Sequence, residues 1–144
     1  MNTVLKKQFI QQYANNYVET AVSEAGPHKL IQMLYEGAIK NMNLAKVFIQ
    51  QKNYEKKSEH INKALAILAS LRGNLDLEHG GEVAQNLNGL YGYCYQTLFQ
   101  SSAKNNVEMI DEVIGHIQTI SDAWQQMPEN IKNASKEQLD RLRV

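Results

Sequence analysis

Residues 27–51, PHKLIQMLYEGAIKNMNLAKVFIQQ, form a long run in which apolar residues recur every three or four positions. That spacing places them along one side of a helix. Pro27 suits the first helical position, where its missing N–H costs no hydrogen bond. The chain has no comparable run in which apolar and polar residues alternate, the pattern that would predict a strand. The stretch therefore predicts one long helix from Pro27 to about Gln51.

The same spacing predicts three further helices downstream. Asn53 is a favourable N-cap for the first of them, and Asn105 and Glu108 have the spacing of a capping box before the last. The three helices are expected to run from Asn53 to about Asp76, from about Glu82 to Lys104, and from Asn105 to about Gln126. Helices of this length joined by short turns are typical of an antiparallel bundle. We therefore expect an all-α protein, with residues 27–127 forming an antiparallel four-helix bundle.

The two ends of the chain are expected to differ from the bundle. In residues 1–20 a narrow apolar stripe falls every four residues on a segment rich in Gln and Asn. A short helix with so little apolar area is not stable alone, because helix nucleation is costly. The segment is therefore expected to pack on the bundle as a short fifth helix, the N-terminal cap. Residues 128–144 are expected to be a flexible or partly helical tail. The cap residues of the stripe are Leu5, Phe9, Tyr13 and Tyr17.

The composition limits the classes of function. The 15 basic residues are balanced by 15 acidic ones, which argues against nucleic-acid binding because that binding depends on neutralising phosphates. A single cysteine suits a reducing compartment. No stretch has the length and apolarity of a membrane-spanning helix, and the N-terminus lacks the pattern of a secretory signal. We therefore expect a cytoplasmic protein with no membrane insertion.

Two of the predicted helices carry more apolar residues than a bundle core requires. A bundle helix needs one apolar face, and the helix from Asn105 has one such face. The stripe expected to form the core on the first helix consists of Leu30, Ile31, Leu34, Ala38, Ala45, Phe48 and Ile49. On the helix from Glu82 it consists of Val83, Leu87, Leu90, Tyr91, Cys94 and Leu98. The surplus apolar residues on these two helices, expected outside the stripes, are Met33, Tyr35, Ile39, Met42, Leu44, Val47, Tyr93, Tyr95 and Phe99. Ile67 is expected to lie outside the core sector of the helix from Asn53 and is counted with them.

Three interpretations account for the surplus residues. The N-terminal cap can cover them and complete an ordinary core. Alternatively, the cap is a removable lid over a groove for an apolar helix of a partner protein, and all the surplus residues except Tyr35 are then expected to contact that partner. The third interpretation is a structural bundle subunit whose surplus surface forms a homodimer. If the groove interpretation holds, Met42→Glu should leave the helical content intact and weaken partner binding.

No arrangement of residues predicts catalysis or a bound metal. Metal sites in four-helix bundles use inward-pointing carboxylates and Glu-x-x-His pairs, and none of the four histidines belongs to such a pair. Gly80 and Gly81 lack the following lysine of a phosphate-binding loop and are expected to form a helix joint. Cys94 lies in the core sector of its helix, which predicts a buried, inert thiol. We expect no cofactor, no metal and no enzymatic activity.

Several motifs, taken in order, resemble those of one family, the FliS family of flagellin-specific export chaperones. The resemblance covers about residues 10–126. The motifs that carry it are Tyr13-Ala14, Val18-Glu19, PHKLIQMLYEGA at 27–38, Lys63-Ala64, LDLEHGGEVAQNLNGLYGY at 75–93 and DAW at 122–124.

The resemblance implies a five-helix, non-catalytic chaperone. Members of the family hold the disordered C-terminal segment of flagellin, which folds into helices on their apolar surface and is kept from polymerising in the cytosol. Members also help to dock flagellin at the flagellar export gate. Their N-terminal segment covers part of the client-binding surface, which matches the lid interpretation and implies that Tyr13 and Tyr17 belong to the lid.

Overall fold

The computed structural model describes residues 26–127, and this part of the chain folds into four helices with no strand. They are α3 (Pro27–Gln50), α4 (Tyr54–Gly73), α5 (Gly81–Lys104) and α6 (Val107–Gln125). Each of the four predicted helices is confirmed to within about one turn at both ends. The predicted cap with Leu5, Phe9, Tyr13 and Tyr17, and the predicted tail 128–144, lie outside the described residues.

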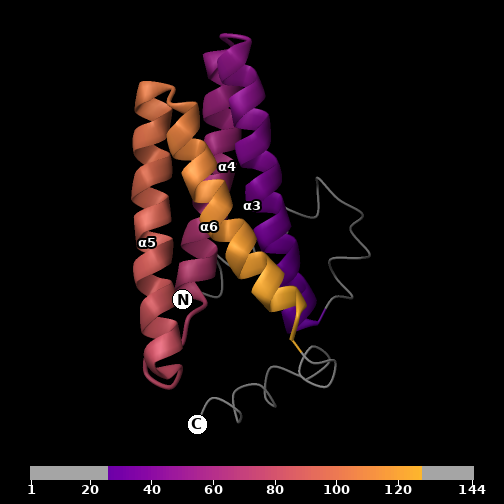
Figure 1. Ribbon diagram of the computed structural model, residues 1–144, viewed down its shortest axis with the longest axis vertical. Helices are drawn as coiled ribbons and strands as arrows, with labels where there is room; N and C mark the ends of the chain where they lie inside the picture. The colour runs from indigo at the N-terminus through magenta and orange to yellow at the C-terminus, as the bar shows by residue number, and fades with distance from the viewer. Residues whose placement is uncertain (1–25, 128–144) are drawn as a thin grey trace.

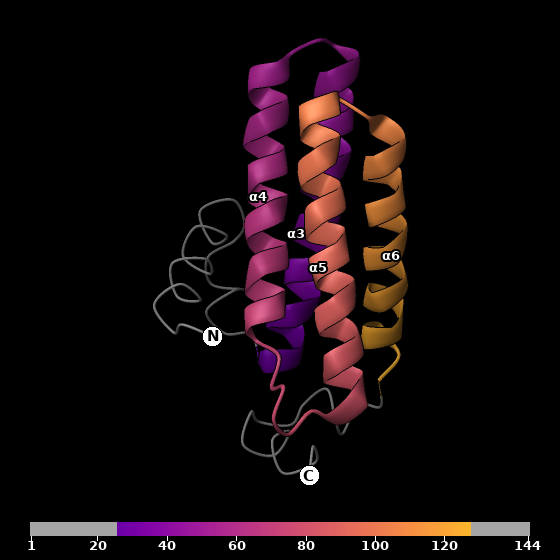
Figure 2. The ribbon, with the colours of Figure 1, turned by 90° about the vertical axis from the view of Figure 1, so that its left-hand side faces the viewer.

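The four helices form an antiparallel bundle, which confirms this part of the predicted fold class (Figure 1). Both α4 and α6 pack against α3, and both also pack against α5. Consequently α3 and α5 lie on opposite corners of the bundle, and in Figure 2 α5 stands in front with α4 and α6 on either side. In Figure 1 the C-terminal end of α6 leans away from the N-terminal end of α5. This divergence opens one end of the bundle.

Asparagines stand at four of the eight helix ends. Asn53 caps α4, since its Oδ1 accepts a hydrogen bond from the backbone N–H of Lys56 at 3.2 Å, as predicted. The predicted cap of α6 is wrong by one residue, because Asn106 accepts from the N–H of Met109 at 3.1 Å. Asn105 instead ends α5 in the left-handed conformation with φ 50°, a conformation that asparagine tolerates better than most residues. Two adjacent asparagines therefore share the turn, one for each helix.

The core differs from the expected stripe on α3. Its most deeply buried residues follow a spacing of three, four and three positions, at Tyr35, Ala38, Met42 and Ala45. This is the spacing of a seam in a supercoiled bundle, where slight underwinding of the helix keeps such positions facing the core. The sequence prediction treated α3 as a straight helix and therefore placed Tyr35 and Met42 outside the core. That prediction is wrong, because Tyr35 is 2% exposed and Met42 is 0% exposed. Leu30, Ile31 and Ile49 pack only at the edge of the core.

A contact between helix ends closes one side of the bundle. The rings of His28 and Trp124 stack with centroids 4.7 Å apart. The indole Nε1–H of Trp124 donates to the carbonyl of His28 at 2.9 Å, and Nε2 of His28 lies 2.7 Å from the carbonyl oxygen of Trp124. That distance requires Nε2 to carry the proton, because a carbonyl oxygen can only accept. The start of α3 is thereby held to the end of α6.

The joint between α4 and α5 needs both of its glycines, as expected, but for different reasons. Gly81 has φ 62°, a backbone conformation that favours glycine. At Gly80 the constraint is space, because an added Cβ would lie 2.5 Å from the carbonyl oxygen of Asp76 and 2.5 Å from the Cβ of Ala84. The joint is thus a structural turn that brings α5 back along α4.

Gly80→Ala is expected to lower the free energy of unfolding by about 1–3 kcal/mol, since a rigid backbone oxygen must move to admit the methyl group. Gly89→Ala is the matched control on α5, where an added Cβ meets nothing within 4 Å, and it should raise stability by about 0.5–1 kcal/mol. Urea unfolding followed by circular dichroism measures both. Equal effects at the two positions would contradict the close approach at Gly80.

Candidate protein-binding surface

A row of apolar side chains runs the length of α5 at intervals of four residues. Residues four apart lie on the same side of a helix, so Val83, Leu87, Tyr91, Tyr95 and Phe99 form one continuous row. The exposed fractions are 69% for Val83, 39% for Tyr95 and 57% for Phe99, but only 2% for Tyr91. The row is thus anchored in the core at its middle and open to solvent at both ends.

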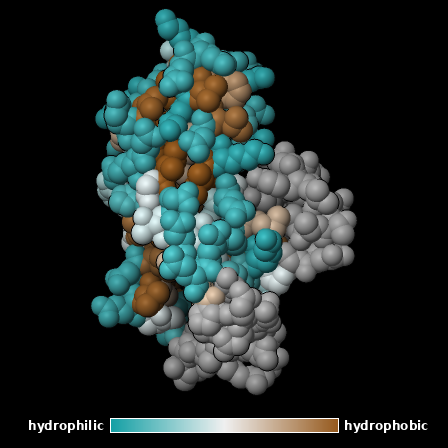
Figure 3. All heavy atoms as spheres, turned by 45° about the vertical axis from the view of Figure 1, so that its right-hand side comes forward, coloured by the Kyte–Doolittle hydropathy of each residue, from teal (hydrophilic) through white to brown (hydrophobic). Residues whose placement is uncertain are grey.

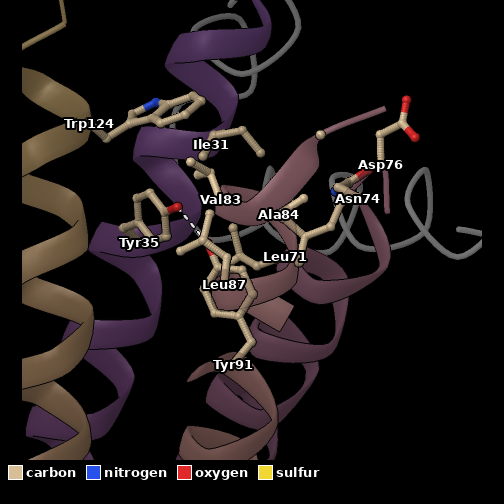
Figure 4. Close-up of a pocket in the computed structure, with 12 residues that line it drawn as sticks. Ile31, Tyr35, Leu71, Asn74, Asp76, Val83, Ala84, Leu87, Tyr91 and Trp124 are labelled. Atoms are coloured by element: carbon tan, nitrogen blue, oxygen red, sulfur yellow. Dashed lines mark hydrogen bonds between the residues drawn. The ribbon is translucent and has the colours of Figure 1, made fainter. Parts of the chain in front are cut away.

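An apolar pocket of about 300 Å³ lies beside the first half of this row, at the end of the bundle where α5 and α6 diverge (Figure 4). We call it the end pocket. All four helices contribute to it, and so does the turn between α4 and α5. Its lining residues are Ile31, Tyr35, Leu71, Asn74, Leu75, Asp76, Gly80, Val83, Ala84, Leu87, Tyr91 and Trp124.

Two tyrosine hydroxyl groups meet inside this pocket. The Oη atoms of Tyr35 and Tyr91 are 2.6 Å apart, and the contact joins α3 to α5 across the bundle (Figure 4). Burial raises the pKa of both side chains, so both hydroxyls stay protonated at neutral pH. The pair therefore fixes the two diagonal helices without placing a charge in the pocket.

A second apolar hollow, also lined by Tyr91, lies between α4 and α5. We call this hollow the α4–α5 groove; its volume is about 360 Å³. Tyr91 lines both hollows. The groove is lined by Leu68, Ala69, Arg72, Gly73, Tyr91 and Tyr95.

A polar cluster lies beside the row on the α6 side. The hydroxyl of Tyr93 donates to Oε2 of Glu112 at 2.5 Å, and Nε2 of His116 is 3.2 Å from the same oxygen. The bond from Tyr93 lowers the pKa of Glu112, with a smaller contribution from His116. The same bond raises the pKa of Tyr93. Glu112 and His116 thus form an exposed pair on α6, and the bond from Tyr93 to Glu112 orients the tyrosine ring at the surface.

The structure exposes some of the predicted partner-binding residues. Tyr95 and Phe99 belong to the α5 row, Tyr93 is 50% exposed beside it, and Val47 is 43% exposed on α3. Figure 3, which brings the α3 side forward, shows apolar side chains in a broken stripe along that face. Met33, Ile39 and Leu44 are partly buried on α3.

For two of these residues the prediction of a surface position is wrong. Met42 is 0% exposed and Ile67 is 2% exposed, and both belong to the core cluster. Met42 lies in the supercoiled seam of α3. Ile67 lies on α4, which packs against both α3 and α5, so more than one side of this helix is buried. A helix that packs against two neighbours buries a wider face, so part of the apolar surplus is ordinary core.

The exposed residues do not form a single groove, because α3 and α5 occupy opposite corners. Val47 on α3 is thus separated from the α5 row by the width of the bundle. Sequence reasoning also missed Val83, which was assigned to the core but is the most exposed large apolar residue described. The four-residue spacing from Val83 to Phe99 was the available signal. A row with this spacing winds slowly around a helix, so its ends turn away from the core.

Cys94 is 0% exposed, which confirms its predicted burial. Loss of hydration raises the pKa of its thiol to about 11. Because the folded state favours the neutral thiol, burial of Cys94 contributes to stability at pH 7, and this contribution is lost as the pH rises from about 9 to 11.

The buried thiol should also be protected from chemical labelling. At pH 8 an aromatic disulfide reagent should label Cys94 only on unfolding, at least about 100-fold faster in 8 M urea than in buffer. Equally fast labelling in buffer would contradict a closed core.

Within residues 26–127, no helix is long and apolar enough to cross a membrane. The same range contains no group of three or more His, Cys, Asp and Glu side chains placed to hold a metal ion. The features that remain as a candidate site are the α5 row and the two hollows beside it.

The known proteins to which this chain is similar are flagellar proteins of one kind. The family model described as flagellar protein FliS matches residues 9–131. The flagellar secretion chaperone FliS of Vibrio cholerae is 40% identical over 124 residues, which are 86% of this chain and 91% of that protein. Its counterpart in Salmonella typhimurium is 40% identical over 119 residues, 82% of this chain and 88% of that protein.

A more distant relative agrees with these matches. The flagellar secretion chaperone FliS of Bacillus subtilis is 34% identical over 117 residues, which are 81% of this chain and 86% of that protein. Identity of this level over nearly the whole of each relative, together with the match to the family model, confirms the resemblance noted in the sequence. The chain belongs to the FliS family of flagellar secretion chaperones.

Proposed function

We propose that this protein binds the disordered C-terminal segment of flagellin in the cytoplasm and keeps it from polymerising before export. The observation that carries the proposal is the α5 row with its two hollows, found in a chain that belongs to a family of flagellar secretion chaperones. The bound segment folds into helices that lay their apolar faces along the bundle. The protein has no catalytic role in this process.

The exposed apolar residues favour a client that wraps around the bundle. Coupled folding and binding of a disordered segment buries roughly 1,000–3,000 Å², because ordering the chain is costly and must be offset by apolar contact. One row on α5 offers too little area for this, whereas a segment that continues to the α3 side gains further contacts at Val47. An extended client can reach both corners of the bundle.

Two further steps belong to the same proposal. The N-terminal cap with Leu5, Phe9, Tyr13 and Tyr17 acts as a lid that covers part of the apolar surface until flagellin displaces it. The protein with its client then docks at a component of the flagellar type III export gate, which receives the flagellin.

Calorimetry tests the central claim. The full-length protein is titrated with the C-terminal segment of the flagellin encoded in the same genome, and with the N-terminal half of that flagellin as control. Saturable one-to-one binding of the C-terminal segment alone, with a negative change in heat capacity, is the expected result, because burial of apolar surface produces that sign. If neither half binds, the proposed client is wrong.

A homodimer would cover the same apolar surface. Its molecular mass in the absence of flagellin would distinguish it from a monomeric chaperone. We expect sedimentation at high protein concentration to show a monomer whose α5 row is free. A dimer that dissociates when Tyr95 and Phe99 are replaced would instead assign the row to self-association.

A further inference from the structure

Arg72 of α4 lies against the backbone of α5 at a position that has no side chain. An added Cβ at Gly92 would be 3.0 Å from Nη1 and 3.2 Å from Cζ of Arg72. The guanidinium therefore lies in the space that any other residue at 92 would enter. Its Nε donates to Oδ1 of Asn88 at 2.7 Å, which fixes its position along α5.

The charge of this guanidinium has no counterion within the described residues. The ion pairs of residues 26–127 are Lys46–Asp111, Asp76–His79 and Glu112–His116. Asn88 is neutral and uses one of the five N–H groups that a guanidinium offers. Nη1 and Nη2 donate to no other side chain or backbone oxygen of this part of the chain. A planar fork with two such groups is the geometry that binds a carboxylate through two hydrogen bonds.

Arg72 also lines the α4–α5 groove, whose remaining lining is apolar or aromatic except for the backbone of Gly73. An unpaired cation thus borders a hollow that fits an apolar side chain. We propose that the α4–α5 groove binds a partner segment in which a carboxylate and an apolar side chain are adjacent, with Arg72 holding the carboxylate and Tyr91 and Tyr95 contacting the apolar group. The identity of this partner as flagellin rests on the proposed function.

The charge and shape of the site favour an acidic peptide over a nucleic acid. Nucleic acids require several cations that neutralise successive phosphates, whereas Arg72 is the only cation among the described residues that line this groove. On a partner helix, a carboxylate and an apolar residue three or four positions apart would face the groove together.

A small probe tests the site without flagellin. The full-length protein is titrated with 3-phenylpropionate, which joins a carboxylate to an apolar ring, and with 3-phenylpropionamide as the uncharged control. The readout is the Nε–H NMR signal of Arg72, one of three arginines in the chain. The expected result is a saturable shift with the carboxylate and at most a small one with the amide. Equal shifts with both probes would overturn the proposal.

Variants at Gly92 sharpen the test because they act on the same guanidinium. Gly92→Asp places a carboxylate beside Arg72 within the chain and should abolish the response to 3-phenylpropionate. Gly92→Asn, of the same size but uncharged, is the matched control and should retain most of it. Either substitution meets only the mobile tip of Arg72, so both proteins should fold. Equal loss in the two variants would show that bulk at 92, and not charge, governs the groove.

A second test measures how the variants bind the C-terminal flagellin segment. Arg72→Gln and Gly92→Asp should each weaken its binding about threefold to fivefold at low salt, the range of an exposed ion pair with good geometry, and should reduce the salt dependence of binding. If the wild-type protein binds flagellin and Arg72→Gln binds equally well, the inference fails and the proposed function stands. If the wild-type protein does not bind flagellin, the proposed function fails and the 3-phenylpropionate result alone decides the inference.

Discussion

Replacing Met42 by glutamate is expected to destabilise the bundle severely. The side chain is 0% exposed in the seam of α3, and a carboxylate there would be buried with no counterion. Such a change costs more than about 4 kcal/mol, against a total stability of about 5–15 kcal/mol for a typical domain. Circular dichroism at 222 nm and urea unfolding at pH 7 measure the loss. This outcome replaces the expectation from helical phase alone, in which Met42→Glu leaves the helices intact.

Val47→Glu is the control for this experiment, because it introduces the same charge one and a half turns further along α3. Val47 is 43% exposed, so its replacement should change stability by less than about 0.5 kcal/mol. A Met42→Glu protein as stable as the Val47→Glu protein would show that the seam does not bury position 42.

The double variant Tyr95→Glu, Phe99→Glu should bind the flagellin segment at least about 30-fold more weakly than the wild type. Exposed aromatic residues are typical anchors of protein interfaces, and losing two of them together with apolar contact costs about 2 kcal/mol or more. The unfolding free energy should change little, because both side chains already face solvent at 39% and 57% exposure. Calorimetry with the C-terminal flagellin segment gives the affinity.

Gln96→Glu with Gln100→Glu forms the matched control, since these residues are exposed neighbours on α5 and add the same two charges. This variant should bind within about threefold of the wild type, because surface charge alone changes affinity little. Equal weakening by the two double variants would attribute the effect to charge repulsion and remove the α5 row from the binding surface.

The bounds of the helices followed from local signals in the sequence. Pro27 begins α3 and Asn53 caps α4, because these effects depend only on the backbone groups of one turn. A single apolar face on α6 was also predicted, and the structure buries Ile110, Val113 and Ile117 on that helix. Its apolar residues occupy a single sector, so the choice of buried side does not depend on which helices lie beside it.

Part of the candidate site was within reach of the sequence as well. Tyr95 and Phe99 fall outside the core sector of α5, and the structure exposes both. The two hollows beside them were not predictable. The end pocket depends on the divergence of α5 from α6, and the groove depends on Arg72 lying across Gly92, 20 positions further along the chain. Both arise from contacts between helices.

The sequence by itself determined the four helices, their order and the family to which the chain belongs, because helix signals are local and family motifs are read directly from residues. Only the tertiary structure decided which apolar residues, whether assigned to the core or to the surplus, reach solvent. Met42 and Ile67 are buried, while Val83 is exposed. The physical reason is that burial of a helix flank depends on the neighbours packed on each side of it and on their tilt, and neither quantity is encoded in the spacing of residues along one helix.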